Sequence, residues 1–298
     1  MKEMTSIFHR FRARHKIVFV YAPHYEFSGS TVMRGQQLSQ IVKSFYGDRY
    51  RVEYHPLSTR FKKSTIFLTK GAVTDITKDE ITTLLEKNNR VFIDPVDNPL
   101  DLDKARAATG IIAASLEAYE SYKKTGLPVH LVNHHVDIRL PREPYSEDTL
   151  RCGYFGELVN TVITDNISKY VDFIHVDTGK QSNDWLSKPR LYNLHYAVRS
   201  DNVLAFKPFL KGFTAAACNA NVIIQRDQRE AVLWLGKDYP YLLKANSTEA
   251  EIIDMLKYAQ KTYGGPVWEK ALKRMEQIRK ATTNETIAKE FIAAIQAP

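Results

Sequence analysis

Short apolar runs alternate with helical patterns through the first half of the chain. The runs that predict strands are residues 16–22, 51–54, 64–68, 90–94, 110–114 and 129–132. Between them, apolar positions such as Leu38, Ile41 and Val42 recur at helical spacing, and Thr77-Lys-Asp-Glu80 has the pattern of a capping box. Strands that alternate with helices in this way predict a parallel sheet with helices packed on its faces.

The same alternation restarts after a polar, proline-bearing stretch near residues 141–146. The second set of runs that predict strands is 151–155, 172–176, 191–198, 222–225 and 241–243. A second capping box, Asn246-Ser-Thr-Glu249, is expected to open a helix, and two further amphipathic helices end the chain. We therefore predict an α/β fold of two doubly wound, Rossmann-like domains, residues 1–145 and 146–298, with helices at the C-terminus.

Composition agrees with a globular protein, since 44% of the residues are hydrophobic and 26% are charged. No apolar run approaches the roughly 18 residues that a membrane span needs. The N-terminus has no apolar segment of signal-peptide form, so the protein is expected to stay in the cytoplasm. Its two cysteines, Cys152 and Cys218, are far apart in the sequence and are expected to be reduced and buried.

A formal net charge of +8 indicates an acidic partner: a nucleic acid, an anionic membrane or a phosphorylated ligand. Residues 1–15 form a basic arm in which Ile7, Phe8 and Phe11 are interleaved with arginines, a pattern compatible with peripheral contact with an anionic membrane. A solvated terminus is the alternative. Nucleic acid is not expected, because no aromatic RNA-binding signature, helix-turn-helix or zinc pattern is present. A dinucleotide-dependent oxidoreductase is disfavoured, because no G-x-G-x-x-G follows a predicted strand.

Residues 206–225, FKPFLKGFTAAACNANVIIQ, read as a basic loop, a short helix of small residues and a buried strand. Lys207 and Lys211 lie where this helix is expected to begin. The backbone N–H groups and the helix dipole favour an anion there, and the lysines add positive charge. The segment therefore predicts a phosphate site, although lysines at a helix start can also be a solvated surface feature.

Three stretches resemble the group-1 families of GT-B glycosyltransferases. VHLVNHHVDIRLP (129–141), followed by RCGYFGEL (151–158), resembles the interdomain passage of those families. TAAACNANVII (214–224) is similar to their "EAmAcGxPVI" helix and strand, and NSTEAEIIDMLKYAQ (246–260) is similar to the helix that follows. The resemblance implies two Rossmann-like domains that face a cleft. It also implies transfer of a sugar from a nucleotide-diphosphate donor to a saccharide or lipid-linked acceptor, in cell-surface polysaccharide or glycoconjugate synthesis.

The chain departs from the group-1 pattern at the acidic pair, because Phe206 and Thr214 occupy the two positions of the E-x7-E motif. Stereochemistry therefore stays open, and a catalytically inactive GT-B-like protein that binds a saccharide or a partner is the alternative. The resemblance implies a donor site without a metal or cofactor in the C-terminal domain. Its candidate residues are Gly156, Glu157, His195, Arg199, Lys207, Lys211 and Thr214. His195 could instead be a core residue, and an Asp101-Leu-Asp103 pattern is explained more simply by helix capping than by metal binding.

The N-terminal domain is expected to bind the acceptor, because open α/β sheets bind ligands at the carboxyl ends of their strands. The loop after the first strand places Gly29 and Arg34 on the acceptor side. An inverting reaction needs a general base. The candidates for it are His24, Glu26 and Asp97, with Asp94 as a further possibility, although turn or capping roles are common for such loop residues. His134 and His135, in the interdomain passage, are expected to have a linker role rather than a catalytic one.

Overall fold

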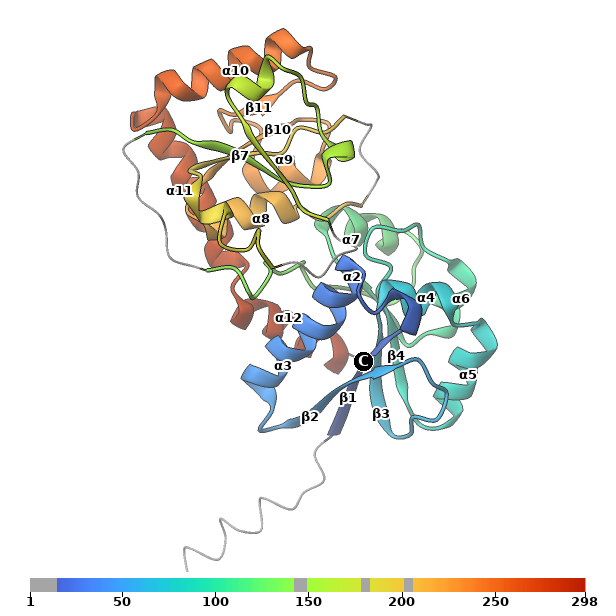
Figure 1. The fold of residues 1–298 in the computed structure, drawn as a ribbon. Coiled ribbons are helices and arrows are strands. Elements are labelled where there is room, and N and C mark those ends of the chain that lie inside the picture. The colour runs from blue at the N-terminus through green and yellow to red at the C-terminus, as the bar shows by residue number, and fades with distance from the viewer. Residues whose placement is uncertain (1–14, 142–148, 178–182, 201–205, 298) are drawn as a thin grey trace, which may run out of the picture.

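The computed structural model describes residues 15–141, 149–177, 183–200 and 206–297, which form two α/β halves (Figure 1). The basic arm, apart from its last residue, and the segment 142–146 of the expected domain boundary lie outside the described residues. Within the described ranges, no helix combines the length and the apolarity that crossing a membrane requires.

The first half contains a six-stranded parallel sheet in the order β2-β1-β3-β4-β5-β6. Its strands are β1 (His15–Tyr21), β2 (Tyr50–Pro56), β3 (Ser64–Leu68), β4 (Arg90–Ile93), β5 (Gly110–Ala113) and β6 (Val129–Leu131). All six predicted strands are therefore confirmed, within a few residues at their ends.

Helices cover both faces of this sheet, because side chains alternate between the faces along each strand. Val18 and Val20 of β1 pack in one cluster with the four helices that follow β3. These helices are α4 (Lys70–Asp75), α5 (Lys78–Glu86), α6 (Leu102–Ala107) and α7 (Leu116–Lys123). Ile17 and Phe19 point to the other face and pack against α3 (Leu38–Tyr46). The expected capping box from Thr77 to Glu80 opens α5.

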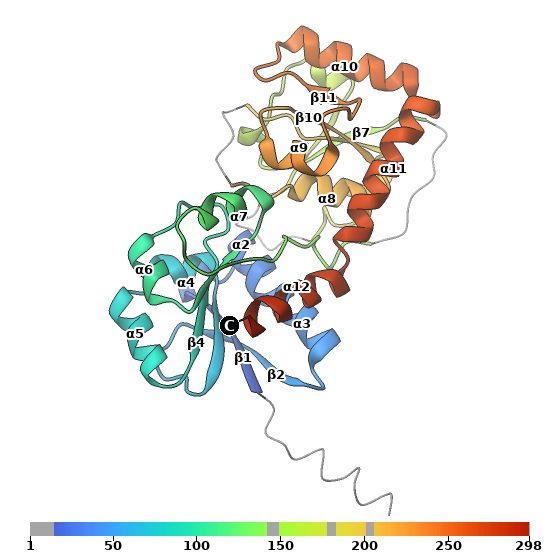
Figure 2. The same ribbon diagram turned by 180° about the vertical axis from the view of Figure 1, so that it is seen from behind.

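The C-terminal helix α12 (Asn284–Gln296) packs on this second face beside α3, as Figure 2 shows from behind. Phe291 contacts Phe19 and Phe67, with ring centroids 5.0 and 5.5 Å apart. Arg90 of β4 donates hydrogen bonds to two carbonyls at the helix C-terminus, where a positive charge is favourable. The division at residue 145 is therefore wrong for α12, which completes the core of the first half because α3 alone leaves that face partly uncovered.

The second half contains a five-stranded parallel sheet in the order β11-β10-β9-β7-β8. Its strands are β7 (Cys152–Gly156), β8 (Asp172–His175), β9 (Leu194–Tyr196), β10 (Asn221–Gln225) and β11 (Leu242–Leu243), which confirms the other five predicted strands. Its helices are α8 (Leu210–Ala217), α9 (Arg229–Leu235), α10 (Glu249–Thr262) and α11 (Pro266–Ala281). The capping box of α10 is formed by Thr248 and Glu251, two residues later than expected. Both cysteines are free and buried, as predicted.

The two sheets share one topological feature that positions the site. In the first sheet β1 lies between β2 and β3, and in the second sheet β7 lies between β8 and β9. The strand order reverses beside β1 and beside β7, and open α/β sheets bind ligands at the carboxyl ends of the strands at such a point. The topology therefore predicts that a ligand binds at the loops that follow β1, β3, β7 and β9.

Candidate active site

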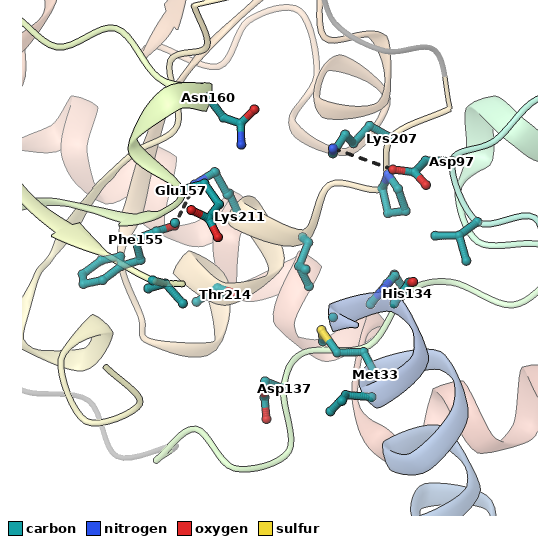
Figure 3. Close-up of a pocket in the computed structure, with 18 of the residues that line it drawn as sticks. Met33, Asp97, His134, Asp137, Phe155, Glu157, Asn160, Lys207, Lys211 and Thr214 are labelled. Atoms are coloured by element: carbon teal, nitrogen blue, oxygen red, sulfur yellow. Dashed lines mark hydrogen bonds and ion pairs between the residues drawn. The ribbon is translucent and has the colours of Figure 1, made fainter. Parts of the chain in front are cut away.

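A cleft of about 590 Å³ lies between the two halves, and loops from the carboxyl ends of both sheets line it. The first half contributes Glu26 after β1, Lys70 after β3 and Asp97 after β4. The second half contributes residues 154–157 at the end of β7, Arg199 after β9 and the start of α8. Figure 3 shows Phe155, Glu157 and Lys211 of the second half across the opening from Asp97 of the first half.

Positive side chains gather at the start of α8. Within the described chain, no side chain caps this helix N-terminus, and its first turn contains no acidic residue. Lys211 donates a hydrogen bond from Nζ to the carbonyl of Phe155 (2.7 Å) and lies over the ring of Tyr154 (3.8 Å). The backbone of Arg199 is fixed by both ends of the Gln225 amide, at 2.9 Å each. Helix dipole and lysine thus favour an anion at the same place.

Crowding of these cations changes their acidity. Burial, together with the charges of Arg199 and Lys207, lowers the pKa of Lys211 to about 7. Burial also lowers the pKa of Lys207, again with a contribution from Arg199. Desolvation and like charge both disfavour the protonated amine, and an arriving anion would reverse the second effect. Such a cluster of perturbed groups in a cleft is typical of a functional site.

Gly156 allows the Lys211 amine to approach the end of β7. Its φ is +152°, in the region that favours glycine, and a Cβ atom there would lie 3.0 Å from Lys211 Nζ and 2.9 Å from the Tyr154 hydroxyl. Gly156, one of the expected donor residues, lines the cleft. A glycine is needed there because the side chains of Lys211 and Tyr154 approach its backbone closely.

Asp97 connects the two halves by ion pairs. Its carboxylate lies 2.6 Å from Lys70 Nζ in the first half and 3.7 Å from Lys207 Nζ in the second half. Burial alone would raise the pKa of Asp97, but the hydrogen bond from Lys70 and the charges of both lysines lower it overall. The Asp97 carboxylate is therefore ionised and has a low affinity for protons, which makes it a poor general base.

Glu26 lines the first-half wall of the cleft, and the Tyr21 hydroxyl donates a hydrogen bond to its Oε1 (3.3 Å). Gly29 lines the same wall, together with Met33 and with Phe27, whose side chain is 56% exposed. The part of the wall around Glu26 thus combines a carboxylate with apolar and aromatic surface.

His24 and Arg34, two of the expected site residues, are not among the residues that line the cleft. The His24 side chain is 60% exposed and lies 3.4 Å from Asp75. Arg34 is fully buried and donates from Nε to Asp94 (2.7 Å) and from Nη1 to the Asn133 carbonyl (3.0 Å). The expectation that Arg34 faces the acceptor needs correction. A short helix (α2, Gly29–Thr31) and a π-helical segment (Val32–Gln37) already precede α3, and they turn this side chain inward.

The other expected donor residues all line the cleft. Thr214 follows Lys211 by one turn of α8. Glu157 directly follows Gly156, and its Oε2 lies 3.0 Å from His175 Nε2. His195 is buried, donates from Nε2 to the Pro189 carbonyl (3.1 Å) and has its pKa lowered to about 4, chiefly by burial. His195 is thus a neutral, hydrogen-bonded wall residue.

The cleft also contains residues that the sequence analysis did not select, among them Lys70, His134 and Trp185. Lys70 follows the predicted strand 64–68 closely, so the rule that ligands bind at carboxyl strand ends could have found it. In the described residues, no group of three histidine, cysteine or acidic side chains is placed to hold a metal ion. Asp101 caps α6, accepting from the backbone of Asp103 and Lys104 at 3.1 Å each, which confirms the capping interpretation.

Comparison with solved structures defines the fold. No protein-family model and no curated protein matches the sequence. HepE from Anabaena, solved with UDP and glucose, is 10% identical, covers 96% of this chain and 100% of its own, and has a TM-score of 0.63. A glycosyltransferase from Rickettsia africae is 8% identical, with 95% and 98% covered and a TM-score of 0.64. In the GtfA/B complex, at 7% identity and a TM-score of 0.54, the match spans 79% of this chain and only 57% of that chain.

These likenesses and the two facing parallel sheets show that the chain has the GT-B fold found in glycosyltransferases, with two Rossmann-like domains, as the sequence predicted. Within that fold the chain is divergent, because Phe206 and Thr214 stand where the group-1 families have glutamates.

Proposed function

We propose that this protein is a glycosyltransferase that moves a sugar from a nucleoside-diphosphate donor to a saccharide or lipid-linked acceptor. The observation that carries the proposal is the gathering of Arg199, Lys207 and Lys211 beside an uncapped helix N-terminus in the interdomain cleft. Structural neighbours support a nucleotide-sugar donor, since HepE was solved with UDP and with UDP-glucose. The neighbour WaaB, a lipopolysaccharide outer core galactosyltransferase with a TM-score of 0.57, supports an acceptor in cell-surface glycoconjugate synthesis.

The chemistry that we propose for the cations is stabilisation of the leaving group. When the bond between the sugar and the diphosphate breaks, negative charge grows on the phosphate oxygens. Lys207 and Lys211, aimed at that charge, bind the transition state more tightly than the ground state. Their charge can supply this stabilisation without a metal ion or a cofactor.

For the first half we propose acceptor binding, with Glu26 as the group that takes the proton from the acceptor hydroxyl. Glu26 lines the cleft and accepts one hydrogen bond from Tyr21, whereas Asp97 is held between two lysines that weaken it as a base.

A catalytically inactive GT-B-like binding protein is the second candidate, because the two positions of the E-x7-E motif carry Phe206 and Thr214. The second candidate binds a saccharide or a partner and leaves a nucleotide sugar intact, so only the transferase consumes the donor. Release of free nucleoside diphosphate from the nucleotide sugar therefore distinguishes them.

The test is calorimetric titration of UDP, GDP and their sugars into the wild type, the Lys211→Ala variant and the Lys257→Ala variant. Lys257 is an exposed lysine of α10 outside the cleft and serves as the matched control. Loss of a charge-assisted contact predicts roughly a ten- to hundredfold weaker nucleotide affinity for Lys211→Ala. Equal affinities in all three proteins would refute the assignment of the donor site.

A further inference from the structure

His134 lies on the segment that joins the two halves, and it lines the cleft. Its side chain is buried, and its backbone N–H donates to the Ala114 carbonyl at 3.1 Å, which fixes the segment to the end of β5. In Figure 3 it lies between Asp97 and Met33, across the opening from Lys211 and Thr214. The histidine is therefore a rigid part of the site rather than a mobile linker residue.

The hydrogen bonds of His134 fix which ring nitrogen carries the proton. Nδ1 lies 3.0 Å from the carbonyl oxygen of His135, which can only accept, so Nδ1 is the donor. Burial lowers the pKa of His134 to about 4, and the nearby charge of Arg34 acts in the same direction, so the ring is neutral near pH 7. In a neutral ring with a proton on Nδ1, Nε2 has a free lone pair and accepts a hydrogen bond.

Nε2 of His134 makes no hydrogen bond with the described residues, and the atom is not sealed off from solvent. Because His134 lines the cleft, Nε2 is open to the cleft. A neutral acceptor selects a ligand group that donates, such as a hydroxyl, and offers nothing to a phosphate oxygen. A sugar attached to a diphosphate at Lys207 would lie near this atom, because Lys207 contacts Asp97, whose charge acts on His134.

We propose that His134 Nε2 accepts a hydrogen bond from a hydroxyl group of the transferred sugar, which makes His134 a specificity-determining residue of the donor site. This inference rests on the proposed function, because it needs a nucleotide sugar in the cleft. The proposal gives the cleft a subsite that binds the sugar and is separate from the site that binds the diphosphate.

The experiment compares UDP and GDP with UDP-glucose, UDP-galactose, UDP-N-acetylglucosamine and GDP-mannose in calorimetric titrations. The variants are His134→Phe, which removes the acceptor, and His134→Gln, which provides a side-chain carbonyl in its place. His130→Phe on β6, outside the cleft, is the control for the same change of side chain. We expect His134→Phe to bind the sugar nucleotide that the wild type prefers with roughly ten- to hundredfold lower affinity. Its affinity for the nucleoside diphosphates should be unchanged. His134→Gln should recover part of that loss.

Nitrogen NMR of the 15N-histidine-labelled wild type provides a readout that does not depend on whether the variants fold. The Nε2 resonance of His134 should be that of an unprotonated nitrogen at neutral pH, and it should shift with the sugar nucleotide but not with UDP or GDP. Equal binding by His134→Phe, or an Nε2 resonance that responds identically to both ligand types, would overturn the inference and leave the donor site intact. A wild type that binds no nucleotide at all would overturn both proposals together.

Discussion

The lowered pKa of Lys211 predicts that nucleoside diphosphates bind more weakly as the pH rises through neutrality. In the free protein this pKa is about 7, against 10.5 for an ordinary lysine, and a bound diphosphate would raise it again. The charged form therefore dominates below pH 7 and is lost above it. Between about pH 6 and about pH 8 its share falls from roughly nine tenths to one tenth, so affinity falls about tenfold, or ~1.4 kcal/mol.

Calorimetry of UDP or GDP binding in two buffers with different ionisation enthalpies measures the proton uptake directly. Near pH 7 the free amine is half protonated and the bound amine is fully protonated, so we expect about half a proton to be taken up per ligand. The nucleotide phosphate titrates in the same range. The Lys211→Met variant is therefore measured in parallel, and the difference between the two proteins is the quantity that counts.

A proton uptake that is equal in the wild type and in Lys211→Met would refute this reasoning. The same pKa shift has a consequence for the free protein, because the unfolded chain binds more protons at Lys211 between pH 7 and its ordinary pKa of 10.5. The free energy of unfolding should therefore rise with pH across that window, and Lys211→Met should remove this part of the slope.

Two substitutions test the packing that positions the site. Gly156→Ala should weaken nucleotide binding about tenfold by pushing the Lys211 amine away, whereas Gly126→Ala, with φ +74° and no atom within 4 Å of the added Cβ, should cost only backbone strain of about 1 kcal/mol. Calorimetry and thermal unfolding measure the two effects, and equal nucleotide affinities would contradict the first. Phe291→Ala should lower the free energy of unfolding by about 3–5 kcal/mol, because Phe291 is fully buried, while Phe45→Ala at a 45% exposed side chain should change it little. Similar denaturant midpoints for these two variants would contradict the placement of α12.

Strands such as β3 and β10 could be predicted from the sequence because strands buried on both faces of a parallel sheet read as short apolar runs. The edge strands β2, β6 and β8 contain no buried residue, and their prediction depended on the alternation with helices along the chain. The partner of each amphipathic helix could not be predicted. The apolar positions Ile287, Phe291 and Ile292 show that α12 has a buried face, but any sheet with an uncovered face would satisfy that pattern. Which sheet has the space depends on how many helices each half places on each face, and that is a property of the whole fold.

The same limit applies to the site. Glu26, Asp97 and Lys211 follow strand ends or begin a helix, so the topology of a parallel sheet brings them to one cleft. Arg34 meets the same criterion in the sequence, yet the start of the helix at Gly29 turns it into the core, where it pairs with Asp94. Side-chain direction depends on where the helix begins, and a shift of one or two residues reverses it.

The ion pairs of Asp97 determine which carboxylate of the cleft can accept a proton. Without a ligand, Lys207 lies 3.7 Å from Asp97, so an arriving diphosphate competes with Asp97 for Lys207. We expect Asp97 to keep its contact with Lys70, which is 2.6 Å without a ligand, and this hydrogen bond lowers the pKa of Asp97. Proton acceptance is then left to Glu26, which like Asp97 belongs to the first half of the chain. The distance of Glu26 from the reacting sugar is set by the separation of the two halves. Glu26→Gln removes the proton-accepting carboxylate and leaves the cations in place, so it should lower turnover while diphosphate affinity stays unchanged.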